Sequence, residues 1–495
     1  MQVHAADGVA VALRPLVAGE SVVVAGRSVI VLQDVAQGHK LAIRDHIIGD
    51  RVVKYGLPIG RAICDIAAGE HVHSHNLVTA LAGELDYARV ESVEPVRTDG
   101  SPAPVWQGYR RADGRAATRN EIWILPTVGC VGLTAEQIAR AAEARHAGAI
   151  AEDRIDGIFA FAHPHGCSQL GDDLAGTRAL LAGLAANPNA AGVLLIGLGC
   201  ESNQLGDLLA AIPQASRAKV RTLSSQGVGD EMAAAAVLVD ELVANASMQQ
   251  REPLPMSALV VGLKCGGSDG FSGLTANPLL GRFSETLAAC GGTPILTEIP
   301  EIFGAEQALL DRARDAETFE AAAALINRFK AYYLDQGLPV SENPSPGNIA
   351  GGITTLEEKS AGAVQKAGTA MLTSVLDYGE QATTPGLALL ESPGNDAVSS
   401  TALAAAGATL VLFTTGRGTP LGFPVPTVKI ASNHTLAASK PHWIDFDASL
   451  VLRAGPRVAD AAFLDELIAI ASGSKTTAER AGQRAIAIWK RGVTL

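Results

Sequence analysis

Three histidines at alternate positions form the densest group of titratable side chains in the sequence. His71, His73 and His75 lie in the segment GEHVHSHN, and alternate residues of a β-strand point to the same face. Three imidazoles on one face can bind a transition metal. The alternative is a polar strand face in contact with water. The clustering of three among the 11 histidines of the chain favours a metal site.

Further basic residues precede these histidines. His39 and Lys40 follow Gly38, and Lys54 begins the segment KYGLPIG. Glycine allows the backbone to approach a ligand closely, and a lysine can hold a carboxylate as a point charge. Lys40 or Lys54 could therefore bind an acidic substrate, whereas the alternative for either is an ordinary surface lysine.

Four cysteines occur where an apolar run meets a Gly-rich loop: Cys130, Cys167, Cys200 and Cys265. Open α/β sheets place their sites at such strand ends. Taken singly, each cysteine is expected to be a small buried hydrophobe. As a set of four they could instead be thiolate ligands, and His163 and His165 beside Cys167 could add imidazole ligands.

The last third of the chain is rich in loops suited to a polyhydroxylated acid. CGGSDGFSG, SPGND and TTGRGTP combine glycine with Asp, Asn395 and Arg417, and backbone N–H groups in such loops can reach a ligand. Turn formation alone would explain any one of these loops. Glu298, Glu301 and Glu306 add carboxylates that could be metal ligands, bases or helix-start charges.

Length and charge limit the classes of function. A chain of 495 residues predicts about three domains. The net charge of -12, without a clustered cationic segment, argues against nucleic acid as a partner. No signal peptide or apolar stretch of membrane-spanning length is apparent, so we expect a cytoplasmic protein with reduced thiols and no membrane contact. A homo-oligomer is compatible with the sequence, which does not fix the oligomeric state.

The pattern of elements predicts a multidomain α/β protein. Short β-rich runs indicate a small β domain over residues 1–92, and the Pro-rich stretch 93–107 is typical of a linker. Strand, loop and helix then alternate over 108–250 and again over 257–495. This alternation predicts two α/β regions with mainly parallel sheets.

Long strings along nearly the whole chain resemble the altronate and galactarate dehydratases. They include DVAQGHKLA, AGEHVHSHN, HGCSQLGDD, CGGSDGFSGLTANPLLGRF and SPGNDAVSSTALAAAGATLVLFTTGRGTP, and PTVGCV and HWIDFDA are most similar to the altronate branch. The resemblance implies dehydration of D-altronate to 2-dehydro-3-deoxy-D-gluconate in hexuronate catabolism, a requirement for Fe(II), and a first domain of the SAF, or β-clip, type. Ile349 and His165 depart from the residues expected for the family.

Dehydration of an aldonic acid requires a base at C2 and an acid or Lewis acid at the C3 hydroxyl. We therefore expect His71, His73 and His75 to bind or flank a mononuclear iron. Lys54 or His39 is the expected base, and Lys40, Asn395 and Arg417 are expected to bind the substrate.

Three alternatives remain open from the sequence. The four cysteines could hold an iron–sulfur cluster, although their spacing is not compact and the family requires added Fe(II). The substrate could be a related sugar acid such as galactarate. A third alternative is a protein that binds sugar acids without catalysis. The many titratable groups in the loops count against it, because binding alone needs no base.

Overall fold

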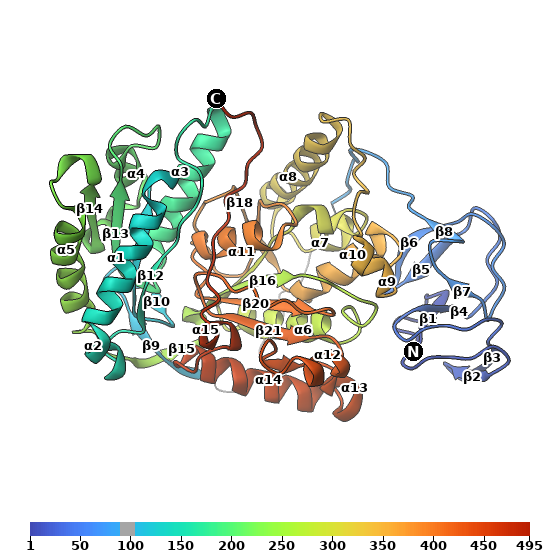
Figure 1. Ribbon diagram of the computed structural model, residues 1–495. Helices are drawn as coiled ribbons and strands as arrows, with labels where there is room; N and C mark the ends of the chain where they lie inside the picture. The colour runs from blue at the N-terminus through green and yellow to red at the C-terminus, as the bar shows by residue number, and fades with distance from the viewer. Residues whose placement is uncertain (90–103) are drawn as a thin grey trace.

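The computed structural model describes residues 1–89 and 104–495. The chain forms a small β domain, a middle α/β region and a larger C-terminal α/β region, and the β domain and the middle region lie at opposite ends of the molecule (Figure 1). The expected order of a β domain followed by two α/β regions with parallel sheets is confirmed. The predicted linker lies mostly outside the described residues, and its last part, 105–107, belongs to strand β9.

The N-terminal domain consists of short antiparallel strands. Its sheets have the orders β1-β4-β7, β5-β6-β8 and β2-β3. The core is aliphatic, with Val9, Val52 and Ile59 almost fully buried. The strands are β1 (Val9–Val11), β2 (Ser21–Val24), β3 (Arg27–Ile30), β4 (Lys40–Ala42), β5 (Arg51–Lys54), β6 (Leu57–Ala62), β7 (His71–Val72) and β8 (Leu77–Val78).

The middle region is a parallel sheet with the order β12-β11-β13-β14 and helices on both faces. Ile122 and Ile124 of β11 pack with α1 and α5, whereas Trp123 and Leu125 join the core that α3 shares with the C-terminal region. Its elements are β11 (Glu121–Pro126), α1 (Gly132–Arg145), α2 (Ala147–Ala151), β12 (Gly157–Ala160), α3 (Gly171–Ala186), β13 (Ala190–Gly197), α4 (Leu205–Ala211), β14 (Val220–Ser224) and α5 (Glu231–Ala246).

A three-stranded antiparallel sheet joins the two α/β regions. It has the order β10-β9-β15 and consists of β9 (Val105–Arg110), β10 (Ala116–Ala117) and β15 (Glu252–Pro255). Because β9 precedes the middle sheet and β15 follows it, this small sheet brings the two ends of the middle region together.

The C-terminal region contains a seven-stranded parallel sheet with the order β18-β19-β17-β16-β20-β21-β22. Its central strands β16 and β20 are buried except for Val260 at the start of β16, because helices cover both faces. The strands are β16 (Val260–Cys265), β17 (Thr293–Leu296), β18 (Leu372–Leu376), β19 (Leu387–Leu390), β20 (Leu410–Thr415), β21 (Thr427–Ala431) and β22 (Phe446–Asp447).

Ten α-helices accompany this sheet in the described chain: α6 (Ala276–Ala289), α7 (Glu306–Leu310), α8 (Ala316–Leu334), α9 (Pro346–Ala350), α10 (Leu356–Ala363), α11 (Asp396–Ala405), α12 (His434–Ser439), α13 (Leu450–Ala454), α14 (Pro456–Ala471) and α15 (Thr477–Arg480). Short 3-10 turns cover Gly129–Val131, Gln214–Lys219, Ser225–Gly227, Met256–Ala258, Ile299–Ile302 and Val364–Ala367. Within the described residues, no helix is both long and apolar enough to span a membrane.

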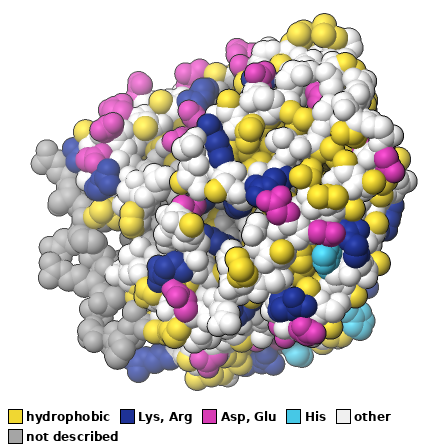
Figure 2. Space-filling model, turned by 90° about the vertical axis from the view of Figure 1, so that its left-hand side faces the viewer, with side chains coloured by type: hydrophobic (Ala, Val, Ile, Leu, Met, Phe, Trp, Pro, Cys, Tyr) yellow, Lys and Arg dark blue, Asp and Glu magenta, His cyan; other side chains and the backbone are white. Residues whose placement is uncertain are grey.

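The end of the chain returns to the middle region. Asp173 at the start of α3 accepts hydrogen bonds from the backbone N–H groups of Arg491 (2.7 Å) and Gly492 (2.9 Å). Leu495 donates its backbone N–H to Ser168 O at 3.0 Å. Figure 2 shows the side of the molecule where the middle region lies, and acidic and basic side chains are interspersed on it.

Candidate active site

Four histidines gather at one edge of the N-terminal domain. His39 Nδ1 lies 3.0 Å from His71 Nε2. The ring of His73 lies 5.0 Å from that of His39 and 5.3 Å from that of His71, and His75 lies 5.5 Å from His71, measured between ring centroids. The structure therefore places His39, one of the two residues predicted as the base, beside the three histidines predicted to bind metal.

The strand that was expected to carry all three histidines is shorter than predicted. Strand β7 ends at Val72, and His73 begins a turn closed by the hydrogen bond from Leu77 N to His73 O at 2.9 Å. Asn76 fixes the turn by accepting a hydrogen bond from His73 N, at 2.9 Å, and by donating one to His71 O, at 3.0 Å. The expectation of a continuous strand is wrong, and a turn held by Asn76 gathers the imidazoles instead.

The environment of the cluster keeps the imidazoles of His39, His71 and His73 neutral. Burial is the main cause that lowers the pKa of His71, to about 3, and repulsion from the neighbouring histidines and Lys40 adds to it. Burial also lowers the pKa of His39 and of His73. A neutral imidazole keeps a nitrogen lone pair available to a metal or to a proton. The donor chemistry of the cluster thus suits a metal or a general base, but its ligand atoms do not converge on one point in the described structure, so binding a metal would require side-chain rotation.

Behind the histidines, two lysines share one buried carboxylate. Lys40 Nζ lies 2.8 Å from Glu358 Oε2 and Lys54 Nζ lies 2.7 Å from Glu358 Oε1, with all three side chains at most 1% exposed. Burial lowers the pKa of Lys40 to about 8, whereas Glu358 raises the pKa of Lys54 above its usual value. The two lysines reduce the pKa of Glu358 to about 2 despite its burial.

This triad fastens the N-terminal domain to helix α10 of the C-terminal region. Lys40 also donates to Gly352 O at 2.7 Å and to Thr354 Oγ1 at 2.6 Å. Both lysines are therefore buried and paired with Glu358, and neither offers an exposed ammonium to a substrate. Lys54, with its raised pKa, is a weaker choice of base than His39.

The loop around helix α9 connects the histidines to the C-terminal sheet. His73 Nε2 lies 3.1 Å from Ile349 O. On the other side of the same loop, Gly351 O accepts from Gly270 N at 2.8 Å, and Asn348 Nδ2 donates to Ser268 O at 2.8 Å. The histidine cluster thus faces the Gly-rich loop that follows strand β16, at the carboxyl edge of the seven-stranded sheet, where α/β proteins bind ligands.

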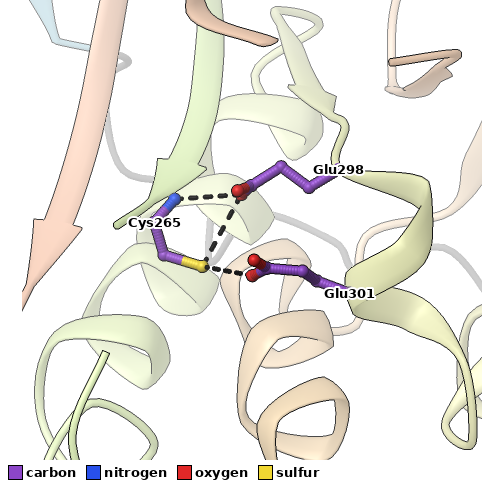
Figure 3. Close-up of side chains that lie close together, drawn as sticks. All are labelled: Cys265, Glu298 and Glu301. Atoms are coloured by element: carbon purple, nitrogen blue, oxygen red, sulfur yellow. Dashed lines mark hydrogen bonds between the residues drawn. The ribbon is translucent and has the colours of Figure 1, made fainter. Parts of the chain in front are cut away.

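A buried thiol and two carboxylates lie at the end of β16 (Figure 3). Cys265 Sγ lies 3.3 Å from Glu301 Oε2 and 3.6 Å from Glu298 Oε2, and Glu298 Oε2 also accepts from Cys265 N at 3.0 Å. Among the described residues, these three side chains alone bring at least three His, Cys, Asp or Glu ligand atoms close enough together for one metal ion.

Three lysines already neutralise this acidic group. Lys366 Nζ lies 2.8 Å from Cys265 Sγ and 2.9 Å from Glu298 Oε2. Lys264 bridges Glu298 and Asp396, and Lys359 pairs with Glu301 at 2.8 Å. Burial is the main cause that raises the pKa of Cys265 to about 12, so the thiol stays protonated. A divalent cation would face three buried ammonium groups here, and the donor set therefore does not fit a metal.

Sequence reasoning named Glu298, Glu301 and Cys265 but missed the lysines that organise them. Lys264 interrupts the apolar strand VVGLKC, and a buried lysine needs an anionic partner. That interruption is the signal that could have revealed the cluster. Glu358 lacked such a signal, because its segment TLEEKS reads as an ordinary helix start.

The remaining predicted substrate ligands lie on loops of the C-terminal region. Asn395 Oδ1 caps helix α11 by accepting from Ala397 N and Val398 N, each at 3.1 Å. Arg417 is exposed and lies beside Gly267, where a Cβ atom would come within 3.2 Å of Arg417 Cβ. Arg417 therefore borders the Gly-rich loop after β16, which is the loop that faces the histidine cluster.

The four cysteines considered as one ligand set are not gathered in the structure. Cys130, Cys167 and Cys200 are exposed and follow strands of the middle sheet. Cys265 is buried at the end of β16 in the other sheet, in contact with Lys366 and two glutamates. A cluster held by all four thiolates is thus excluded for this arrangement of the chain.

Comparison with known proteins identifies related sequences for every part of the chain. Residues 1–80 match the altronate/galactarate dehydratase SAF domain, residues 108–247 the second domain of D-galactarate dehydratase/altronate hydrolase, and residues 256–494 the C-terminal domain of D-galactarate/altronate dehydratase. The SAF type expected for the first domain is confirmed.

Individual relatives cover the full length. The altronate dehydratase of Escherichia coli (strain K12) is 49% identical over 499 residues, and that of Bacillus subtilis (strain 168) is 48% identical over 501 residues; each alignment covers 100% of this chain and 99% of the relative. The galactarate dehydratase (L-threo-forming) of Escherichia coli (strain K12) is 31% identical, over 90% of this chain and 88% of the relative.

Proposed function

Because the chain belongs to the D-galactarate/altronate dehydratase family, we propose that it removes water from D-altronate to give 2-dehydro-3-deoxy-D-gluconate. The observation that carries the proposal is the identity of 49% and 48% to two altronate dehydratases over the whole chain, against 31% to a galactarate dehydratase. This difference supports altronate over galactarate.

The reaction breaks one C–H and one C–O bond. A base takes the proton at C2, hydroxide leaves from C3 with a proton supplied to it, and the resulting enol becomes the 2-keto acid. Charge that develops on the substrate carboxylate needs a nearby cation. The base must also be unprotonated near pH 7.

His39 is the residue that we propose as the base. Its lowered pKa keeps it neutral at pH 7. Its ring nitrogen lies 3.0 Å from His71 Nε2, so a single hydrogen shared between the two rings fixes their tautomers. Since the ring is only half-buried, it can meet a substrate at the surface of the cluster.

His71, His73 and His75 are the residues that we propose to hold a mononuclear iron(II). Neutral imidazoles without a competing ammonium in hydrogen-bond contact suit such an ion, in contrast to the lysine-bound group around Cys265. When bound, iron would supply positive charge to the substrate carboxylate and the leaving hydroxyl.

Residues of the other loops complete the proposed site. Arg417, exposed beside the Gly-rich loop, supplies a guanidinium for the substrate carboxylate, and Asn395 supplies amide hydrogens for hydroxyl groups. Lys40 is buried behind the histidines. We therefore assign it to positioning the N-terminal domain against the loop around α9, through its bonds to Gly352 O and Glu358.

The test is anaerobic turnover of a panel of sugar acids with Fe(II), measured as 2-keto acid formation. We expect D-altronate to react much faster than galactarate. Formation of product from galactarate alone, or from no sugar acid, would overturn the proposal.

Replacement of single histidines tests the proposed ligands. We expect His71→Ala, His73→Ala and His75→Ala to lose iron and turnover, and His39→Ala to lose turnover while keeping more iron. His442→Ala, at an exposed position of the C-terminal region, is the matched control. Full activity with unchanged iron in the first three variants would remove the metal assignment.

A further inference from the structure

Three cysteines occupy corresponding positions at the carboxyl edge of the middle sheet. In the parallel pair β11 and β13, Pro126 lies opposite Ile196, and a cysteine lies four residues after each of them, Cys130 and Cys200. Cys167 follows β12, the neighbour of β11 on its other side. We infer that these three thiolates bind an iron–sulfur cluster, at a site separate from the histidine cluster.

The three cysteine-bearing loops are bonded to one another. Gly129 N donates to His165 O at 2.9 Å, which joins the loops of Cys130 and Cys167. Asn203 N donates to Gly166 O at 2.9 Å and Asn203 Nδ2 donates to Thr127 O at 3.2 Å, which joins the loop of Cys200 to both. The sheet edge and these bonds therefore fix the three loops as one unit.

A glycine directly precedes each of the three cysteines. Gly166 has a φ of 100°, and a Cβ atom there would lie 2.1 Å from Thr127 O. Gly199 has a φ of 130°. Gly129 is packed against the loop of Cys167, since a Cβ atom there would lie 3.0 Å from His163 O. Glycine thus lets the loops approach closely enough to present their next side chains at one edge.

The thiols differ from Cys265 in their surroundings. All three are exposed, whereas Cys265 is buried and bonded to charged groups. The only hydrogen bond to any of the three sulfur atoms in the described structure is a long one, 3.7 Å, from Gln226 Nε2 to Cys200 Sγ. Exposed thiols at a sheet edge are available to an inorganic cofactor, because no ion pair has to break first.

Helix N-termini add a favourable field at the same edge. Helices α1 and α3 start shortly after Cys130 and Cys167, at Gly132 and Gly171, and neither has a side-chain cap. Uncapped N–H groups at a helix start attract negative charge. A thiolate-bound cluster carries negative charge, so the two helix starts and the cysteines favour the same ligand.

The number of ligands predicts the type of cluster. No three thiol, imidazole or carboxylate atoms converge here closely enough for a single metal ion, in the part of the chain that the structure describes. A cube of four irons is larger and separates its thiolates further. Three cysteines would bind three of its irons and leave the fourth for a ligand from outside the protein.

Anaerobic purification and reconstitution of the full chain with iron and sulfide test this inference. We expect close to four acid-labile sulfides per chain and about five irons, four in the cluster and one at the proposed histidine site, with visible sulfur-to-iron absorption. Cys130→Ser, Cys167→Ser and Cys200→Ser should each lose more than half of the labile sulfide. Cys64→Ser, at an exposed cysteine of the N-terminal domain, should lose none.

The inference would be overturned by the absence of labile sulfide in the reconstituted wild type, or by the same labile sulfide in all three serine variants. Zinc bound without sulfide would also overturn it. Circular dichroism of each variant checks that the middle region is folded. The His71→Ala variant should keep its labile sulfide, so this test and that of the histidine site can fail separately.

Discussion

Replacing Glu358 by glutamine should weaken the attachment of the N-terminal domain more than any single surface change. The variant keeps the shape of the side chain but leaves two buried ammonium groups, those of Lys40 and Lys54, without a counter-charge. The two lysines lower the pKa of Glu358 from an ordinary 4.5 to about 2. This difference corresponds to about 3 kcal/mol, in line with the ~3–5 kcal/mol lost when one partner of a buried pair is removed.

The expected effect on thermal unfolding follows from that free energy. A loss of about 3 kcal/mol lowers Tm by roughly 6–12 °C for a unit the size of the C-terminal region. Calorimetry at pH 7 measures the shift, and hydrogen exchange should show faster opening around strands β4 and β5, which carry the two lysines. Glu252→Gln is the control, because its pair with Arg110 is about half exposed and is worth ~0–1 kcal/mol.

The pH dependence has a definite sign. Since the pKa of Glu358 is lower in the folded protein, its contribution is complete above about pH 4.5 and is lost as the pH falls towards 2. The difference between wild type and Glu358→Gln should therefore shrink over this range. A Tm difference no larger than that of Glu252→Gln at pH 7 would refute the reasoning.

Three further changes have expected outcomes. Because the pKa of His71 falls to about 3, the wild type should lose stability relative to His71→Ala as the pH falls from 6.5 towards 3, measured by urea unfolding. Gly352 has a φ of 97°, and a Cβ atom there would lie 2.6 Å from Gly38 O, so Gly352→Ala should abolish most turnover. At Gly455 no atom lies within 4 Å of such a Cβ, so Gly455→Ala should reduce the free energy of unfolding only by the ~1–3 kcal/mol of backbone strain. Lys366→Met should lower Tm by several degrees, because it leaves the carboxylate of Glu298 with one fewer ammonium partner.

Periodicity predicted the layout of the chain but not how its parts meet. The alternation of strand and helix over 108–250 and 257–495 appears as two parallel sheets, because buried parallel strands produce apolar runs that are visible in the sequence. The register of the histidines was misjudged, since β7 ends at Val72 and a turn continues. Residues spaced by two look like a strand even when a side chain such as Asn76 folds them into a turn.

Charge pairing across the domain boundary was the part that no local pattern could reveal. Lys40 and Lys54 are more than 300 positions away from Glu358 in the sequence, and each alone resembles a surface residue. The sequence therefore supported three roles for the lysines, surface group, substrate ligand and, for Lys54, general base, and the structure shows a fourth. Both lysines are buried behind the histidines, and Glu358 already compensates their positive charge near the proposed base. The cation that the substrate carboxylate requires therefore has to come from the proposed metal or from an exposed group such as Arg417.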